Sequence, residues 1–128
     1  MNAIKQKYLI KAPIEKVWEA LTNEKVINSW GGGPARMDGK KGTRFKFWGG
    51  DIFGENTEVV PNKKLVQNWY AGKWDKPSIV TFDLSYKNGV TAVNLTHTDV
   101  PGYEAKDIEM GWKDYYMIPL KEFVEKEN

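Results

Sequence analysis

The sequence predicts an α+β domain in which helices cover one face of an antiparallel sheet. Apolar and polar residues alternate with period two in several stretches between residues 34 and 98, and turn residues separate these stretches. Apolar residues recur at helical spacing in the segments 13–30 and 103–126 on either side of them. An antiparallel sheet commonly buries one face, so we expect the helices to pack on one side of it.

The N-terminal segment predicts one strand followed by two helices. Lysines alternate with largely apolar residues over residues 4–11, which indicates a strand with a charged outer face. Pro13 suits the first turn of a helix, where its missing N–H costs no hydrogen bond, and this helix should run to about Thr22. Asn23 can cap a second, shorter helix that ends at the glycines of residues 31–33.

About six antiparallel strands should follow these helices. Alternation and turn residues delimit the segments 43–48, 52–60, 64–71, 80–86 and 90–98. The tripeptides Gly49-Gly50-Asp51 and Lys87-Asn88-Gly89 are hairpin signals between them. Gly54 lies inside a predicted strand, where a glycine indicates either a bulge or the close approach of another backbone.

The run from residue 103 to 126 should be the longest helix, and the sheet should fold around it. Its apolar residues form one broad stripe: Ile108, Trp112, Tyr115, Tyr116, Leu120 and Phe123. Pro119 lies inside this run and removes one backbone hydrogen bond. We therefore expect the helix to bend about one turn before Pro119.

Composition bounds the class of protein. The chain has 128 residues, which fits one domain over residues 1–128, and its net charge of +2 is too balanced to indicate nucleic acid or a membrane as partner. It has no Cys, so disulfides, thiolate metal sites and Cys nucleophiles are excluded. The sequence shows neither the apolar block of a signal peptide nor the roughly 20 apolar residues of a membrane span. We expect a soluble cytoplasmic protein.

Aromatic residues, 13% of the chain, should lie in or around the space between the sheet and the long helix. They either form a solid core, as protein interiors usually do, or line a mostly apolar pocket with a few polar groups. Gln67 and a tyrosine hydroxyl of the helix would be such polar groups. The candidates for lining a cavity are Phe45, Phe47, Gln67, Trp69, Phe82, Leu95, His97, Trp112, Tyr115 and Tyr116.

His97 is the only histidine, and the alternation places it on the same face as Val93 and Leu95. It could act as a general base or a polar anchor in the cavity, or it could be a hydrogen-bonded structural residue. The structural role is favoured, because a base needs an oriented partner and a substrate within reach. One His without Cys does not indicate a metal site. We therefore assign no catalytic residue, no metal and no cofactor.

Several motifs resemble a known family. The order β-α-α-β-β-β-β-β-β-α, with APIEKVW at residues 12–18 opening the first helix, is similar to the helix-grip or START-like superfamily. Within it, three stretches resemble the family of activator of heat-shock protein 90 ATPase homologues. These are GENTEVVP at 54–61 with LVQNW at 65–69, KNG at 87–89 followed by Thr91, and GWKDYY at 111–116.

The resemblance implies a curved antiparallel sheet wrapped round a long C-terminal helix. It also implies that the chain matches only the C-terminal type of domain in the eukaryotic co-chaperones, without the N-terminal domain that binds the chaperone's middle segment and stimulates ATP hydrolysis. The favoured hypothesis is a non-enzymatic module that binds a small hydrophobic or amphipathic ligand between sheet and helix. One alternative is a stress-related co-chaperone-like domain that engages heat-shock protein 90. Another is a cavity-based hydrolase or cyclase-like enzyme that uses His97.

Overall fold

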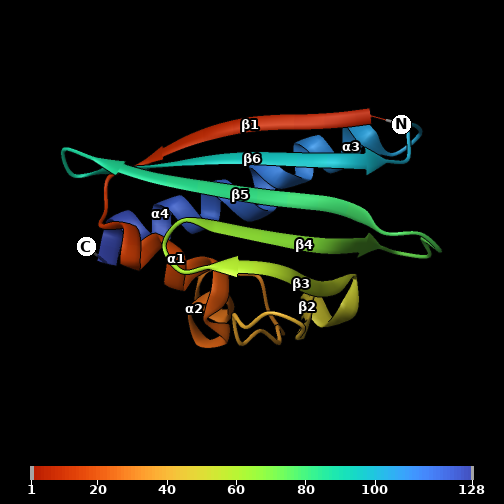
Figure 1. The fold of residues 1–128 in the computed structure, drawn as a ribbon, viewed down its shortest axis with the longest axis horizontal. Helices are drawn as coiled ribbons and strands as arrows, with labels where there is room; N and C mark the ends of the chain where they lie inside the picture. The colour runs from red at the N-terminus through yellow and green to blue at the C-terminus, as the bar shows by residue number, and fades with distance from the viewer. Residues whose placement is uncertain (1, 128) are drawn as a thin grey trace.

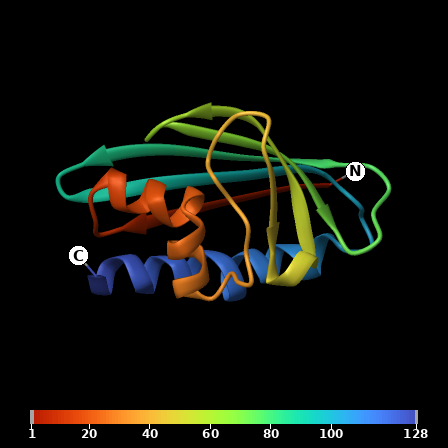
Figure 2. The ribbon, with the colours of Figure 1, turned by 90° about the horizontal axis from the view of Figure 1, so that it is seen from below.

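A computed structural model describes residues 2–127 and shows a six-stranded antiparallel sheet with its helices on one face (Figures 1 and 2). The strand order is β1-β6-β5-β4-β3-β2, so the first strand of the chain pairs with the last. The long C-terminal helix crosses beneath the sheet in Figure 2, and the end of the sheet that carries β2 and β3 curves down toward it. The predicted α+β helix-grip architecture is confirmed.

The elements follow the predicted order. They are β1 (Asn2–Ile10), α1 (Ile14–Thr22), α2 (Glu24–Trp30), β2 (Arg44–Phe47), η1 (Trp48–Gly50), β3 (Ile52–Val60), β4 (Lys64–Ala71), β5 (Ser78–Lys87), β6 (Val90–Val100), α3 (Ala105–Gly111), η2 (Trp112–Met117) and α4 (Ile118–Glu127). Within residues 2–127, five strands follow α2 where about six were expected. Before β2 there is only an isolated bridge between Arg36 and Lys46, because Gly39 and Gly42 have positive φ and interrupt an extended chain.

The two short helices begin and end where their capping residues predict. Pro13 precedes α1, and the Asn23 side chain accepts a hydrogen bond of 2.9 Å from the Lys25 N–H at the start of α2. Gly31, with φ of 109°, ends α2 in a left-handed conformation that favours glycine. The Trp30 indole donates to the carbonyl of Ala20 at 2.8 Å, which holds the two helices together.

One face of the sheet is buried against the helices, and β4 shows which residues lie on it. In β4, Leu65, Gln67 and Trp69 are buried, whereas the residues between them are only half-buried and face outward. A Cβ on Gly54 would lie 1.9 Å from the carbonyl oxygen of Asn68, so the close backbone approach predicted there is confirmed.

The C-terminal helix is continuous from α3 through α4 but is π-helical between Trp112 and Met117. The N–H of Ile118 donates to the carbonyl of Lys113, a spacing of five residues. The irregularity ends at Met117, two residues before Pro119, so the disturbance expected there takes the form of a wider turn. A wider turn keeps Trp112 and Tyr116 together on the buried face and leaves Tyr115 exposed, so the expected place of Tyr115 in the buried stripe is wrong.

No helix within residues 2–127 is both long and apolar enough to cross a membrane.

Candidate functional site

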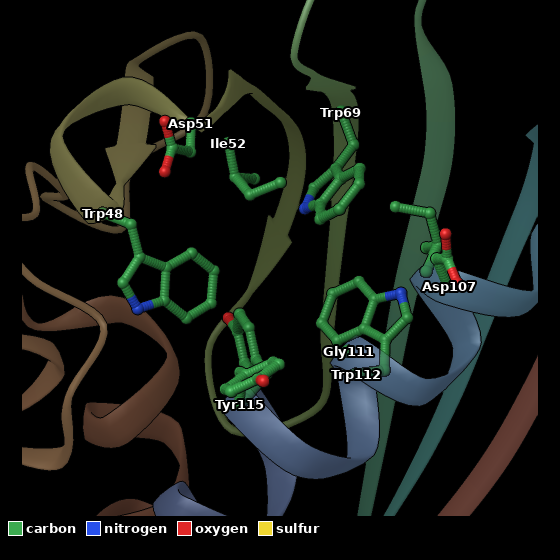
Figure 3. A pocket seen from close by; sticks show the side chains of 10 residues that line it. Trp48, Asp51, Ile52, Trp69, Asp107, Gly111, Trp112 and Tyr115 are labelled. Atoms are coloured by element: carbon green, nitrogen blue, oxygen red, sulfur yellow. The ribbon is translucent and has the colours of Figure 1, made fainter. Parts of the chain in front are cut away.

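A pocket of about 310 Å³ opens between the C-terminal helix and the curved end of the sheet (Figure 3). We call it the aromatic pocket, and ten residues line it: Trp48, Asp51, Ile52, Trp69, Asp107, Ile108, Gly111, Trp112, Tyr115 and Tyr116. One side is built by η1, the start of β3 and β4, and the other by two successive turns of the helix and the π-helical segment. Five of these residues are aromatic, and Asp51 and Asp107 carry carboxyl groups.

Stacked rings form the inner wall of the aromatic pocket. Trp69 stacks on Trp112 with ring centroids 5.3 Å apart and an interplanar angle of 27°. Tyr116 follows along the helix, 4.7 Å from Trp112. Such offset and tilted arrangements are favoured between aromatic rings and bury much apolar surface. The inner wall is therefore built from rings that already pack against each other without a ligand.

Trp48 closes the opposite side of the pocket from a strained backbone position. Its φ is 50°, and Gly49 and Gly50 after it also have positive φ. A bulky residue in this region costs about 1–3 kcal/mol, and such residues cluster at functional sites. The indole N–H of Trp48 donates to the carbonyl of Gly31 at 2.7 Å, which fixes the ring. The turn after β2 thus aims Trp48 at the helix (Figure 3).

His97 joins the wall to the sheet behind it. The Trp112 indole N–H donates to His97 Nδ1 at 2.9 Å. An indole only donates, so Nδ1 is the accepting nitrogen and the proton lies on Nε2. Nε2 then donates to Ser78 Oγ at 2.7 Å, and the Ser78 hydroxyl donates to the Trp69 carbonyl at 2.7 Å. This chain of hydrogen bonds, which we call the histidine relay, fixes the neutral tautomer of His97 and holds both Trp112 and Trp69.

This arrangement leaves His97 no free nitrogen. The side chain is fully buried, does not line the pocket, and has its pKa lowered to about 3 by burial. A general base needs an accessible lone pair near its substrate, which His97 lacks here. The geometry supports the hydrogen-bonded structural role and gives the hydrolase hypothesis no base at this position.

Tyr116 contributes the one buried side-chain polar atom among residues 2–127 that has no hydrogen-bond partner. The residue is 3% exposed and lines the pocket. Burial raises the pKa of its hydroxyl, which therefore stays protonated. An unpartnered buried hydroxyl costs about 1–3 kcal/mol, and a bound molecule could remove that cost by supplying a partner.

Gly111 lies where the helix borders the pocket. Its backbone is helical, with φ of −63°, and an added Cβ would meet no atom within 4 Å. The glycine is therefore not required by the helix or by packing against the sheet. Its effect is to leave room in the pocket that any larger side chain would occupy.

The candidates predicted from the sequence divide into two groups. Trp69, Trp112, Tyr115 and Tyr116 line the pocket, with Tyr115 70% exposed at its rim. The other candidates are buried and do not line it: Phe45, Phe47, Gln67, Phe82, Leu95 and His97.

Phe47 and Gln67 show why buried candidates do not border the pocket. Phe47 packs against Trp30 and stacks with Tyr116, at centroid distances of 6.1 and 5.3 Å. Gln67 donates to Asn56 Oδ1 at 3.1 Å inside the core, so its polar group is already used.

Six lining residues are not among the ten predicted cavity candidates: Trp48, Asp51, Ile52, Asp107, Ile108 and Gly111. The three that lie on the helix, Asp107, Ile108 and Gly111, could have been predicted from the sequence. The pairs 107–108, 111–112 and 115–116 repeat every four residues and therefore lie on one face of the helix. Trp48 and Asp51 had none, because their direction depends on three successive positive-φ residues that period-two alternation does not describe.

Comparisons with known proteins agree with the fold. The family model described as "Activator of Hsp90 ATPase homolog 1-like protein" matches residues 11–125. The human activator of 90 kDa heat shock protein ATPase homolog 1 is 26% identical over 110 residues, which are 84% of this chain and 32% of the human protein. The chain thus spans about a third of the length of the curated relatives it matches.

Solved structures show the same likeness. A crystal structure of an HSP90 activator from Plasmodium falciparum has a TM-score of 0.86 and 25% identity, covering 95% of each chain. The solution structure of the Aha1 dimer from Colwellia psychrerythraea has a TM-score of 0.82 and 26% identity, covering 98% of this chain and 97% of that one. With the family model matched over residues 11–125, this chain belongs to the activator of Hsp90 ATPase homolog 1-like family.

Proposed function

We propose that the chain is a non-enzymatic module that binds one small hydrophobic or amphipathic molecule in the aromatic pocket. The observation that carries this proposal is a pocket of about 310 Å³ with preformed aromatic walls. Small-molecule sites are typically concave, mostly apolar and at least about 300 Å³, with a few polar groups that orient the ligand. Tyr116 lines the pocket and has a buried hydroxyl without a hydrogen-bond partner, and we propose that this hydroxyl orients the ligand.

Two features argue that the space is a site and not a packing defect. Protein interiors normally close-pack, yet the helix has a glycine at position 111 where a larger side chain would fit without a clash. Across the pocket, Trp48 adopts an unfavourable backbone conformation that directs its ring at the same space. Both features work against stability alone, and both are accounted for if the space holds a ligand.

The test fills the pocket without disturbing the fold. Wild-type protein is screened against neutral amphipathic aromatic and aliphatic compounds by thermal unfolding, and hits are titrated by tryptophan fluorescence. A true ligand at 100 times its Kd should stabilise the fold by about 2.7 kcal/mol. Gly111→Leu should keep the fold and lose this stabilisation, because its side chain would occupy the pocket.

Met110→Leu is the matched control, since Met110 is the neighbouring helix residue, is exposed, and does not line the pocket. This control should bind as the wild type does. If neither a neutral nor a charged amphipathic compound stabilises the wild type, the proposal is wrong. If Gly111→Leu binds the hits with unchanged affinity, the ligand site lies elsewhere.

A second candidate function is co-chaperone-like binding to an Hsp90-type chaperone in the cytoplasm. It is supported by the names of the relatives and by an apolar patch on the outer face of the sheet. In that patch Phe53 stacks on Tyr70 with ring centroids 5.0 Å apart, and Phe53 and Ile79 are 37% and 40% exposed. Exposed apolar groups of this kind are typical of protein-binding surfaces.

Co-sedimentation with an Hsp90 chaperone and a titration of its ATPase rate test this candidate. Phe53→Ser should weaken binding, whereas Leu9→Ser, which alters an exposed apolar residue of β1, should not. Absence of both binding and any change in ATPase rate would exclude it.

A further inference from the structure

We propose that the ligand of the aromatic pocket carries a positively charged ammonium group on an apolar body. This inference rests on the proposed function and narrows it to a chemical class. It follows from the charges of the lining residues, from their aromatic faces, and from the hydroxyl of Tyr116.

The charged groups at the pocket have one sign. Asp51 and Asp107 are both exposed, and Lys, Arg and His are absent from the ten lining residues. In Figure 3 the two carboxylates lie on either side of the group of aromatic rings. A charged ligand that enters this space therefore meets negative charge from two separate elements, the start of β3 and the helix.

These two carboxylates are also unused. Within residues 2–127, neither pocket aspartate has an ion-pair or hydrogen-bond partner for its side chain. Their charge is not neutralised by a neighbouring lysine or arginine. It remains available to a cation at the mouth of the pocket, although the chain as a whole is slightly basic.

The aromatic walls favour the same sign of charge. Trp48, Trp69 and Trp112 come from three different elements and surround the space together with Tyr115 (Figure 3). The face of an aromatic ring carries partial negative charge and attracts ammonium groups, tryptophan most strongly. A cage of such rings recognises quaternary ammonium groups in particular, because their methyl groups also bury apolar surface.

The deep polar group is compatible with this ligand. The Tyr116 hydroxyl is neutral, buried and without a partner, so it can accept a hydrogen bond from an N–H or O–H of the ligand or donate one to it. An anionic ligand would face the two carboxylates at the rim. The arrangement therefore selects against anions and favours cations.

The test compares ligands of equal shape and different charge. The probes are para-hydroxyphenyl-trimethylammonium, its neutral isostere para-tert-butylphenol, and the anion para-hydroxybenzenesulfonate, each titrated by calorimetry at low and at physiological salt. We expect the cation to bind at least about tenfold more tightly than the neutral isostere, because cation–π attraction and the carboxylates act together. We expect the anion not to bind, and the preference for the cation to fall with added salt.

Variants assign the preference to the pocket. Asp51→Asn with Asp107→Asn should weaken cation binding about five- to tenfold and leave the neutral isostere unchanged. Asp83→Asn with Asp114→Asn is the matched control, since it removes the same charge at exposed positions that do not line the pocket. It should leave the binding of both probes unchanged.

The outcomes separate the two proposals. If the cation and the neutral isostere bind with equal affinity, or the neutral compound binds more tightly, the inference about charge is wrong while the pocket remains a ligand site. If the double aspartate variant and its control weaken the cation equally, the pocket carboxylates are not responsible and the inference is again wrong. If neither these probes nor any compound of the neutral panel binds, the proposed function itself fails.

Discussion

The two ends of the space between sheet and helix are filled in different ways. Under α1 and α2 much of the fill is aliphatic: beside the buried rings of Trp18 and Trp30 lie the fully buried side chains of Val17, Ala20, Leu21, Ile27 and Leu120. Beside α3 and η2 the fill consists of tryptophan and tyrosine rings, and a pocket remains between them. Aliphatic side chains interdigitate at close-packed density, whereas flat rings whose N–H groups are hydrogen-bonded keep fixed planes and leave gaps. At the end beside α3 and η2, the hydrogen bonds that hold the rings therefore keep the aromatic pocket open.

Removal of an anchored ring should have the largest effect. Trp112→Ala should lower the free energy of unfolding by about 3–5 kcal/mol, since it creates a cavity beside Trp69 and Phe82 and leaves His97 Nδ1 without a donor. Trp112→Phe keeps much of the ring and removes the donor, so it should cost less. Urea denaturation measures both. A near-neutral Trp112→Ala would show that this end is loosely packed.

The histidine relay predicts a pH dependence at the aromatic end. His97 has its pKa lowered from 6.5 to about 3, so between these values the unfolded state binds a proton that the folded state does not. Stability from this group is complete above about pH 6.5 and is lost as pH falls toward 3, at about 1.4 kcal/mol per pH unit. From pH 6.5 to 4.5 the loss should be about 2–3 kcal/mol. His97→Gln should be flatter in this window, and equal slopes would contradict a buried neutral histidine.

Enlarging one residue at each end compares how tightly the aliphatic and the aromatic ends are packed. Ala20→Leu at the aliphatic end should destabilise by about 1–3 kcal/mol, because added methylenes have no space there. Gly111→Leu at the aromatic end should be neutral or stabilise by up to about 1 kcal/mol, because it removes a helical glycine and meets no neighbour. Thermal unfolding of the two variants side by side gives the difference. Equal destabilisation would mean that the pocket is closed in solution.

The smallest expected effect concerns the hydroxyl of Tyr116. Tyr116→Phe removes a buried oxygen that has no hydrogen-bond partner, so the ligand-free protein should gain about 1 kcal/mol. Tyr8→Phe serves as comparison, since the Tyr8 hydroxyl donates to Gln6 Oε1 at 2.5 Å and its loss should not stabilise. Chemical denaturation without ligand measures both. A destabilised Tyr116→Phe would indicate that this hydroxyl is hydrogen-bonded in solution.

Sequence periodicity predicted the order of strands and helices and the aliphatic end better than it predicted the aromatic end with its pocket. Alternation located the strands, and helical spacing placed Trp112 and Tyr116 against the sheet correctly. Periodicity also turned His97 inward, but it could not show that the partners of this ring are Trp112 and Ser78 from distant positions. The ten cavity candidates included six core residues, because alternation reports which face is buried and not which buried residues border empty space.

Two aromatic residues of the pocket have orientations that the sequence patterns do not describe. Trp48 reaches the pocket through left-handed backbone, and Tyr115 lies at the rim because a π-helical turn rotates it outward. Both depend on local departures from regular geometry that propensities describe poorly. The Gly49-Gly50 pair did signal a turn, but the direction of the preceding side chain follows from the φ angles of the whole turn.

The pairing of β1 with β6 has a consequence for how this molecule folds. Ile4 lies opposite His97 and Ile10 opposite Thr91, so the first strand has no partner until nearly all of the chain is available. The strands from β2 to β6 can form as successive hairpins, but closing the sheet at β1 requires a contact across almost the full sequence. Such non-local pairing slows folding. We expect β1 to join late, and until then the edge of β6 is open to other extended chains, which makes dilute conditions favourable for refolding.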